Sequence, residues 1–345
     1  MERILIIKLG SLGDVVHTLP ALVDLKRSFP DSQIDWLVER RVAVILQGNP
    51  LLHQIIEVDT QLWRRRWWTA EARRQLQQAL RTLRSRQYDL ALDFQGLWKS
   101  AAFGFLSGAR CVLGFDREGL KEPGCRILYS GRVRPAPGVR HVIEIYRELV
   151  RSLGVTPTDI SFPLQVSEKD EAYVASQLDS RHLRDFVILN PGGGWVTKNW
   201  DPERYAELHL RLRDSVGLQS VLTWGPGEER LIEAIFQRTQ NDPPVAFPTT
   251  IPQFIALARR ARLFIGGDTG PMHLAAACNT PVVGIFGPTS SARNGSFRPA
   301  DLAVSHDVPC GPCYKRTCEK YQRKCLQLVT VDDVYNAVLR RLNLP

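Results

Sequence analysis

The first residues able to do chemistry lie between the first apolar run and the first helical pattern. Ile4–Ile7 is a run of strand length, and the turn after it holds Gly10, Gly13 and a single acid, Asp14. Open α/β sheets bind ligands at the carboxyl ends of their strands, where this turn must lie. The Asp14 carboxylate therefore either acts on such a ligand or caps the following helix, because Asp is favoured at N-caps.

Four glycine turns in the second half of the chain each follow a strand-like run. Glycine lets backbone amides approach a ligand without a Cβ in the way. The amides after Asp268 also open a helix, which favours a phosphate. We expect the four turns to meet at one crevice along one sheet edge. They are Gly192-Gly193-Gly194, Gly225-Pro226-Gly227, Gly266–Gly270 and Gly287-Pro288-Thr289.

Other nucleotide-binding patterns are missing from the sequence. It contains neither the G-x-G-x-x-G dinucleotide fingerprint nor the P-loop pattern G-x4-G-K-[ST]. This counts against an NAD-dependent dehydrogenase and against an ATPase.

Positive charge is concentrated in residues 64–86, which hold eight arginines and one acid. For positions 73–86 we favour a solvated helix face. The triplet Arg64-Arg65-Arg66 differs because tryptophans flank it at 63, 67 and 68, a pattern typical of a binding edge or a membrane-interface patch. The net charge of +9 suits nucleic acid, an anionic membrane or an anionic substrate.

Four of the seven cysteines lie within 16 residues, at Cys310, Cys313, Cys318 and Cys325. Clustering of this kind in a cytosolic chain argues against a disulfide framework. Zinc sites usually pair two C-x2-C knuckles, and this spacing has only one. Reduced thiols or a redox pair are therefore favoured over a structural metal.

The elements that position these residues alternate between strand and helix in both halves. This alternation predicts parallel sheets with right-handed crossovers, and 345 residues favour two domains. We expect domains over residues 1–160 and 175–330, a linker near 155–180, a loop over 132–139 and a final helical segment over 331–345. No apolar run approaches the roughly 18 residues of a membrane span. The start does not fit a signal peptide, so a cytoplasmic protein is predicted.

Together these features resemble the inverting GT-B glycosyltransferases of family 9, the ADP-heptose:lipopolysaccharide heptosyltransferases, and most closely the members that add the first heptose. The resemblance runs from residue 4 to 289. The cysteine-rich segment 310–325 differs from the pattern of the members that add the first heptose, so the resemblance does not identify the acceptor. The motifs that carry it are GSLGDVVHTLPA (10–21), DFQGLWKS (93–100), KNWDP (198–202), GDTGPMHLAAA (267–277) and GPT (287–289).

The resemblance implies a GT-B fold with two Rossmann-like doubly wound domains facing a cleft, and transfer of heptose from ADP-heptose to Kdo-lipid A. Asp14 is then the general base. It implies no cofactor, no catalytic metal and no nucleic-acid partner, and a cytoplasmic location peripheral to the inner membrane. The implied donor-binding residues are Ser11, Thr197, Lys198, Glu228 (or Glu229), Asp268, Thr269, Gly270 and His273. The implied acceptor-binding residues are Arg64, Arg65, Arg66, Gln95, Lys99 and Lys121.

Three alternatives remain open on the sequence. One is a family member that acts on a later core acceptor, such as a heptosyltransferase II or III. The others are a non-catalytic nucleotide-sugar-binding protein and a nucleic-acid-binding protein. The nucleic-acid alternative leaves the glycine turns unexplained, and no such binding motif is present.

Overall fold

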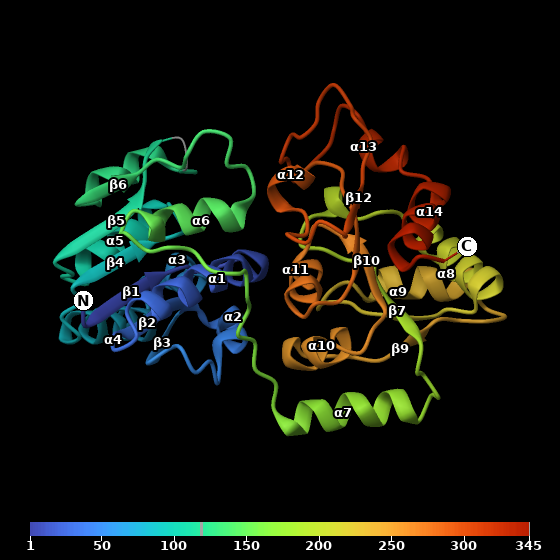
Figure 1. Ribbon diagram of the computed structural model, residues 1–345, viewed down its shortest axis with the longest axis horizontal. Helices are drawn as coiled ribbons and strands as arrows, with labels where there is room; N and C mark the ends of the chain where they lie inside the picture. The colour runs from blue at the N-terminus through green and yellow to red at the C-terminus, as the bar shows by residue number, and fades with distance from the viewer. Residues whose placement is uncertain (118–119, 345) are drawn as a thin grey trace. The chain divides into compact units, whose positions relative to one another are not determined.

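The computed structural model describes residues 1–117 and 120–344 and divides into two units, 1–165 and 166–345 (Figure 1). Pro345, the last residue of the predicted carboxyl-terminal segment, lies outside the described residues. Among the described residues, no helix is long and apolar enough to cross a membrane.

The first unit is built on a six-stranded parallel sheet in the order β3-β2-β1-β4-β5-β6. The central strand β1 forms because Ile4–Ile7 is apolar throughout and is buried on both faces. The strands are β1 (Arg3–Ile7), β2 (Gln33–Glu39), β3 (Gln54–Val58), β4 (Leu90–Asp93), β5 (Cys111–Phe115) and β6 (Gly131–Val133). The helices are α1 (Leu12–Ser28), α2 (Arg40–Ala43), α3 (Thr60–Arg66), α4 (Ala70–Ser85), α5 (Trp98–Leu106) and α6 (Val142–Arg151).

The second unit repeats this order as β12-β11-β10-β7-β8-β9, again all parallel. Both sheets therefore have the strand order of the Rossmann fold, which confirms the predicted fold class. The strands are β7 (Phe186–Asn190), β8 (Gln219–Leu222), β9 (Val245–Ala246), β10 (Leu263–Gly267), β11 (Val282–Ile285) and β12 (Leu302–Val304). The helices are α7 (Glu168–Asp179), α8 (Pro202–Val216), α9 (Glu229–Arg238), α10 (Ile251–Ala258), α11 (Gly270–Ala277), α12 (Ser291–Asn294), α13 (Lys324–Gln327) and α14 (Val331–Leu342).

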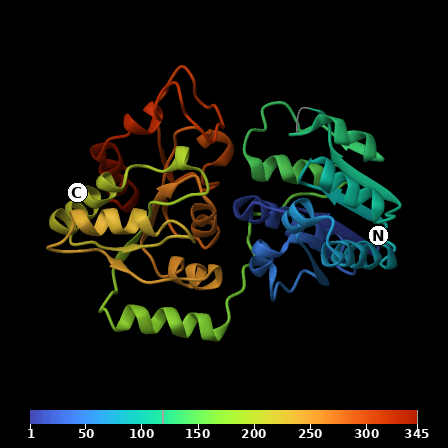
Figure 2. The same ribbon diagram turned by 180° about the vertical axis from the view of Figure 1, so that it is seen from behind.

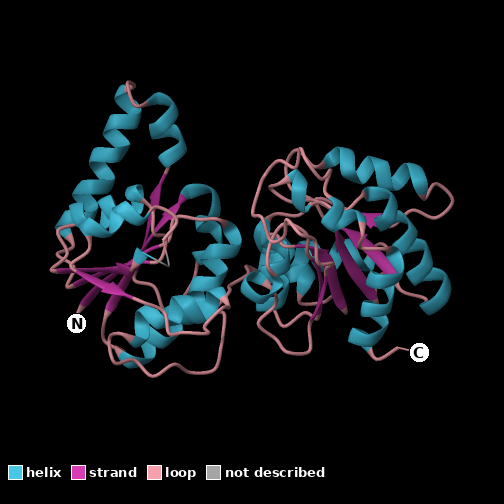
Figure 3. Ribbon diagram, turned by 90° about the horizontal axis from the view of Figure 1, so that it is seen from above, coloured by secondary structure: helices cyan, strands magenta, loops and turns pink. Residues whose placement is uncertain are grey.

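Helices cover the faces of each sheet (Figures 2 and 3). In the first unit, alternate strand residues such as Leu5 and Ile7 pack in one apolar cluster with side chains of α4 and α5. Helices α1 and α6 contact each other, and α6 contacts β5. In the second unit, α8, α9 and α14 share a cluster with the sheet, while α10 contacts α7 and α11.

Two predicted connections contain regular structure, although the boundary between the units falls inside the predicted linker. The predicted linker 155–180 contains helix α7, which begins after Ser167, whose side chain accepts a hydrogen bond from the amide of Asp170. The predicted loop 132–139 begins inside strand β6, which pairs with β5. Both elements are short or weakly apolar, so their periodicity was hard to detect.

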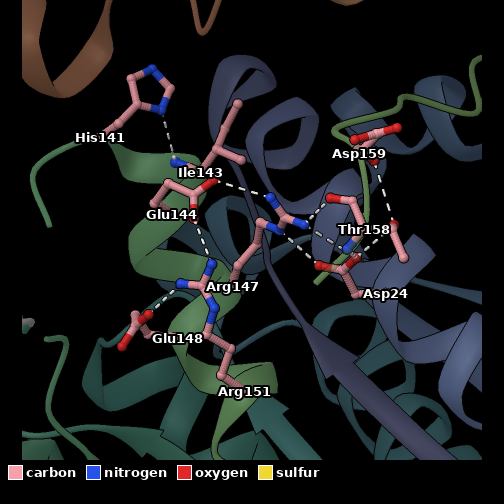
Figure 4. A network of polar contacts seen from close by, with 9 residues as sticks. All are labelled: Asp24, His141, Ile143, Glu144, Arg147, Glu148, Arg151, Thr158 and Asp159. Carbon is pink, nitrogen blue, oxygen red and sulfur yellow. Dashed lines mark hydrogen bonds and ion pairs between the residues drawn. The ribbon is translucent and has the colours of Figure 1, made fainter. Parts of the chain in front are cut away.

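A buried ion pair fixes α1 to α6 (Figure 4). Arg147 on α6 donates from Nε to Oδ2 of Asp24 on α1 at 2.7 Å, and both side chains are at most 5% exposed. The Thr158 amide donates to the other carboxylate oxygen of Asp24 at 2.9 Å. The pair therefore sets how two helices and the chain after α6 fit together.

Replacing Arg147 should destabilise the protein strongly. Arg147→Ala leaves the Asp24 carboxylate buried without its partner, which costs about 3–5 kcal/mol. Urea unfolding followed by circular dichroism measures the loss. Arg151→Ala on the same helix is the matched control, because its pairs with Glu144 and Glu148 are half-exposed and such pairs contribute about 1 kcal/mol or less. Equal losses for both variants would contradict the assignment.

Candidate active site

Asp14 lies in the first turn of α1, directly after the carboxyl end of β1. It is the third residue of the helix and not the N-cap, which is Ser11. Its Oδ2 accepts hydrogen bonds from the Ser11 amide at 2.9 Å and from Ser11 Oγ at 3.0 Å. The side chain stays 27% exposed. Asp14 therefore stabilises the helix start while it remains accessible.

The other carboxylate oxygen of Asp14 faces two buried polar groups. Tyr146 on α6 donates its hydroxyl to Oδ1 at 3.2 Å, and Lys8 Nζ lies 3.6 Å away. Lys8 is 2% exposed and also donates to Tyr146 Oη at 2.6 Å and to the Phe94 carbonyl at 2.9 Å. The Lys8 ammonium lies 4.4 Å from the centre of the Tyr146 ring. This arrangement orients the carboxylate and compensates its charge.

These neighbours keep Asp14 ionised. Burial raises the pKa of Asp14, but the positive charges of Lys8 and Lys121, the Ser11 amide and His17 bring that pKa well below its ordinary value. A carboxylate with a lowered pKa is ionised at neutral pH and can accept a proton.

The turn after β4 holds the Asp14 turn in place. Gln95 Oε1 accepts from the amides of Leu9 at 3.1 Å and Gly10 at 3.2 Å. Asp93, fully buried, in turn accepts from the Gln95 amide at 2.8 Å. Gln95 therefore lies beside the Asp14 turn, as predicted from the ends of the two strands.

The basic residues of the first unit lie at different places. Lys121 is exposed and near enough to lower the pKa of Asp14. Lys99 Nζ bonds to Thr60 Oγ1 at 2.9 Å and lies 3.3 Å from Glu39 Oε1. The Arg64-Arg65-Arg66 triplet forms the exposed last turn of α3.

In the second unit the four glycine turns do lie along one sheet edge, because they follow the parallel strands β7, β8, β10 and β11. A Cβ on Gly193 would lie 2.7 Å from Thr269 Cγ2, and one on Gly267 would lie 2.8 Å from the Lys198 carbonyl. A Cβ on Gly192 would collide with the Glu228 carboxylate. The turns after β7, β8 and β10 are therefore in contact, and their close approach requires glycine.

Lys198, Asp268 and His273 form one polar chain at this edge. Lys198 Nζ donates to Asp268 Oδ2 at 2.9 Å and to the Asp268 carbonyl at 2.8 Å. His273 Nε2 lies 3.1 Å from Asp268 Oδ1. The side-chain amide of Asn294 donates from Nδ2 to Asp268 Oδ2 at 3.1 Å. Burial raises the pKa of Asp268, but His273 and Lys198 hold it far below its usual range. Asp268 does not cap α11, whose N-cap is Thr269.

The start of α11 presents amides with no helical acceptor. Gly270 and Met272 lie in the first turn, where amides have no acceptor within the helix, and Pro271 carries no amide proton. The Thr269 side chain makes no capping bond. Positive helix-dipole charge and two amides can therefore bind an anion here.

The remaining predicted donor residues take part in internal contacts. Thr197 is buried and donates its hydroxyl to the Lys315 carbonyl at 2.8 Å, so its single proton is already used. Glu228 Oε2 accepts from the Gly225 amide at 2.7 Å, and Glu229 Oε1 accepts from the Gly227 amide at 3.2 Å. Glu228 is half-buried, whereas Glu229 is exposed.

The sequence prediction missed two residues of this site. Lys8 and Tyr146 contact Asp14, yet neither lies in a motif read as functional. A lysine directly after an apolar strand was the available signal, because lysine is almost never fully buried without a partner. Asp201 occupies the N-cap position of α8, but its carboxylate accepts a hydrogen bond from Arg323 at 2.9 Å and makes no capping bond.

The four clustered cysteines are free thiols in the structure. Within the described part of the chain, no three His, Cys, Asp or Glu side chains are placed to hold a metal ion. The Cys318 sulfur accepts from the Arg323 amide at 3.2 Å.

Comparison with known proteins extends the resemblance over nearly the whole chain. The pattern of glycosyltransferase family 9 (heptosyltransferase) matches residues 76–323. The chain is 32% identical to lipopolysaccharide heptosyltransferase 1 of Pseudomonas aeruginosa, over 92% of this chain and 87% of that protein. It is 27% identical to lipopolysaccharide heptosyltransferase 3 of Escherichia coli, over 80% of each.

A solved structure agrees with both sequence matches. The E. coli heptosyltransferase WaaC with ADP is similar with a TM-score of 0.78 and 25% identity, covering 98% of this chain and 99% of that one. The motifs, the two Rossmann-like sheets and these matches lead to one conclusion: the chain belongs to glycosyltransferase family 9, the heptosyltransferases.

Proposed function

We propose that this heptosyltransferase moves L-glycero-D-manno-heptose from ADP-heptose to Kdo-lipid A, with inversion at the anomeric carbon. The observation that carries the proposal is the ionised, accessible Asp14 carboxylate, held by Lys8 and Tyr146 at the end of β1. The family membership supplies the sugar class, and the 32% identity to a heptosyltransferase 1 favours the first heptose.

In this mechanism Asp14 is the only proton acceptor required. The acceptor hydroxyl attacks the anomeric carbon, the bond from that carbon to the ADP oxygen breaks, and Asp14 takes the hydroxyl proton. Its low pKa makes it a weak base, so the proton moves late, once the new C–O bond has made the hydroxyl acidic. General base catalysis of this kind contributes about 10²–10⁴-fold.

The donor binds through the second unit. Lys198 and the amides of Gly270 and Met272 take the diphosphate, replacing the charge stabilisation that a metal ion supplies in other transferases. Glu228 accepts from the ribose hydroxyls, because it lies between two of the glycine turns. Asp268 and His273 orient Lys198 and face the sugar, with Thr197 and Thr269 beside them. From the first unit, Ser11 lies next to the base.

The acceptor binds through the basic residues of the first unit. Carboxylates of Kdo and phosphates of lipid A suit guanidinium and ammonium groups. Lys121 lies near Asp14, and Gln95 and Lys99 follow β4 at the same sheet edge. Lys99 contacts Thr60, the first residue of α3, and Arg64–Arg66 form the last turn of the same helix.

An acceptor-screened assay of ADP release tests the proposal. ADP should form from ADP-heptose only when Kdo-lipid A is present. Turnover on a heptosylated core but not on Kdo-lipid A would favour a later step, which the 27% identity to a heptosyltransferase 3 keeps as the second candidate. Donor binding without turnover on any core acceptor would overturn the enzymatic function.

We also propose that α3 and the turn after it bring the enzyme to the cytoplasmic face of the inner membrane, where lipid A is anchored. Trp67 is 69% exposed and Trp68 is 60% exposed, with ring centres 6.2 Å apart. They directly follow three exposed arginines. Exposed indoles beside cations are typical of a surface that enters the headgroup region of an anionic bilayer.

Removing both indoles should weaken vesicle binding. Trp67→Ala/Trp68→Ala should reduce partitioning onto phosphatidylglycerol-containing vesicles by about tenfold or more, because each indole buries a large apolar surface. Vesicle flotation measures the partitioning. Phe105→Ala is the matched control: Phe105 is 60% exposed but adjoins the far end of α4, a helix roughly 24 Å long. Unchanged binding of the double variant would refute the membrane proposal.

A further inference from the structure

The cysteine-bearing segment 310–325 lies against the sheet edge of the second unit that carries the glycine turns. The Tyr314 amide donates to the Pro288 carbonyl at 2.8 Å, in the turn after β11. Thr197 Oγ1 donates to the Lys315 carbonyl at 2.8 Å, in the turn after β7. Residues 314–315 are thus fixed to two of the four turns.

The far end of the segment is fixed as well. Arg323 donates from Nη1 to the Asn199 carbonyl at 2.7 Å and from Nη2 to Asp201 Oδ1 at 2.9 Å. The Arg323 amide donates to the Cys318 sulfur at 3.2 Å, which closes the segment on itself. Contacts at both ends therefore hold the intervening residues in place.

Arg316 projects from this fixed segment onto an indole that Lys198 shares. The Arg316 guanidinium carbon lies 5.1 Å from the centre of the Trp195 ring, and Lys198 Nζ lies 4.6 Å from the same centre. Arg316 is exposed, and no carboxylate of the described residues forms an ion pair with it. The Trp195 ring therefore holds two cations close to one place, and of the two only Lys198 has a carboxylate partner among the described residues.

The anion site at α11 adjoins this pair of cations. A Cβ on Gly193, two residues before Trp195, would lie 2.7 Å from Thr269 Cγ2 at the start of α11. Lys198 is held by the residue before Thr269. Three groups that bind anions therefore lie close together: the first-turn amides of α11, the Lys198 ammonium and the Arg316 guanidinium. A guanidinium binds phosphate oxygens in a bidentate manner that a lysine cannot reproduce.

We propose that Arg316 is a second cation for the diphosphate of the donor, delivered by segment 310–325 and set beside Lys198 by the Trp195 indole. The inference rests on the proposed function, because it takes a nucleoside diphosphate as the ligand of this edge. It gives the segment a role in donor binding.

Isothermal titration of ADP and AMP into the full chain tests the proposal. Arg316→Ala should weaken ADP binding about tenfold to a hundredfold, as expected for loss of a hydrogen bond to a charged group. AMP, which has one phosphate, should be affected much less. Arg316→Lys should restore only part of the ADP affinity. Lys320→Ala is the control, because that cation stacks on Tyr321 in the same segment, and it should bind ADP like the wild type.

Each contrary outcome points to one conclusion. Unchanged ADP affinity in Arg316→Ala would overturn the inference and leave the proposed function standing. Equal weakening of ADP and AMP would assign Arg316 a purely structural role and overturn it too. A wild-type chain that fails to bind ADP would instead overturn the donor assignment on which the inference rests.

Discussion

Asp14→Asn is expected to lower kcat by about 10²–10⁴-fold while the Kd for ADP stays unchanged. The amide keeps the size of the side chain and accepts from the Ser11 amide, but it cannot take up a proton. The proposed donor contacts lie in the second unit, so the substitution should leave them intact. A continuous assay of ADP release gives kcat, and calorimetry gives the Kd.

The control for Asp14→Asn is Asp31→Asn, at an exposed aspartate of the same unit. It should retain wild-type kcat. A matching fall in thermal stability and kcat for Asp14→Asn would indicate that the residue is only a helix-capping group. Wild-type turnover in Asp14→Asn would end the general-base assignment.

Lys198→Ala is expected to lower kcat/KM by about 10²–10³-fold, the usual effect of removing one group that stabilises developing charge. The lysine is 15% exposed and its partner Asp268 is 4% exposed, so the variant also removes the cationic partner of a buried carboxylate that His273 and Asn294 contact as well. A loss of stability should therefore accompany the loss of activity, and urea unfolding would detect it.

Lys169→Ala on α7 is the matched control for Lys198→Ala, because Lys169 is an exposed lysine of the same unit. It should retain both kcat/KM and stability. A Lys198→Ala variant that is destabilised but keeps its kcat/KM when folded would contradict the phosphate role and leave only the structural one.

The fold was largely predictable because the strands of both sheets are strongly apolar. Ile4–Ile7 and Phe186–Leu189 are continuous buried runs, and helices α8 and α14 begin and end where their periodicity does. Helix α7 was missed because its apolar side chains are few, with Val174 and Leu178 as its buried residues. The resemblance to family 9 was confirmed by the comparisons.

The candidate site was predictable where a motif joins a glycine turn to a polar residue, as at Asp14 and Asp268. It was not predictable where contact depends on packing between distant elements. Tyr146 reaches Asp14 from a helix 132 residues further along the chain, and no local pattern encodes that approach. The partners of Lys198 and Thr197 were likewise not predictable. They lie in the turn after β10 and in segment 310–325, which only the fold places beside the turn after β7.

The pairing of Lys198 with Asp268 has a consequence for the end of the catalytic cycle. A lysine of this low exposure without a carboxylate would have its charge balanced only by the bound diphosphate, and spent ADP would leave slowly. If Lys198 binds the diphosphate as proposed, Asp268, 2.9 Å from the ammonium, takes the place of the departing phosphate as its partner. Under the proposed function, this pairing would lower the affinity for ADP, speed product release and keep the lysine oriented for the next donor.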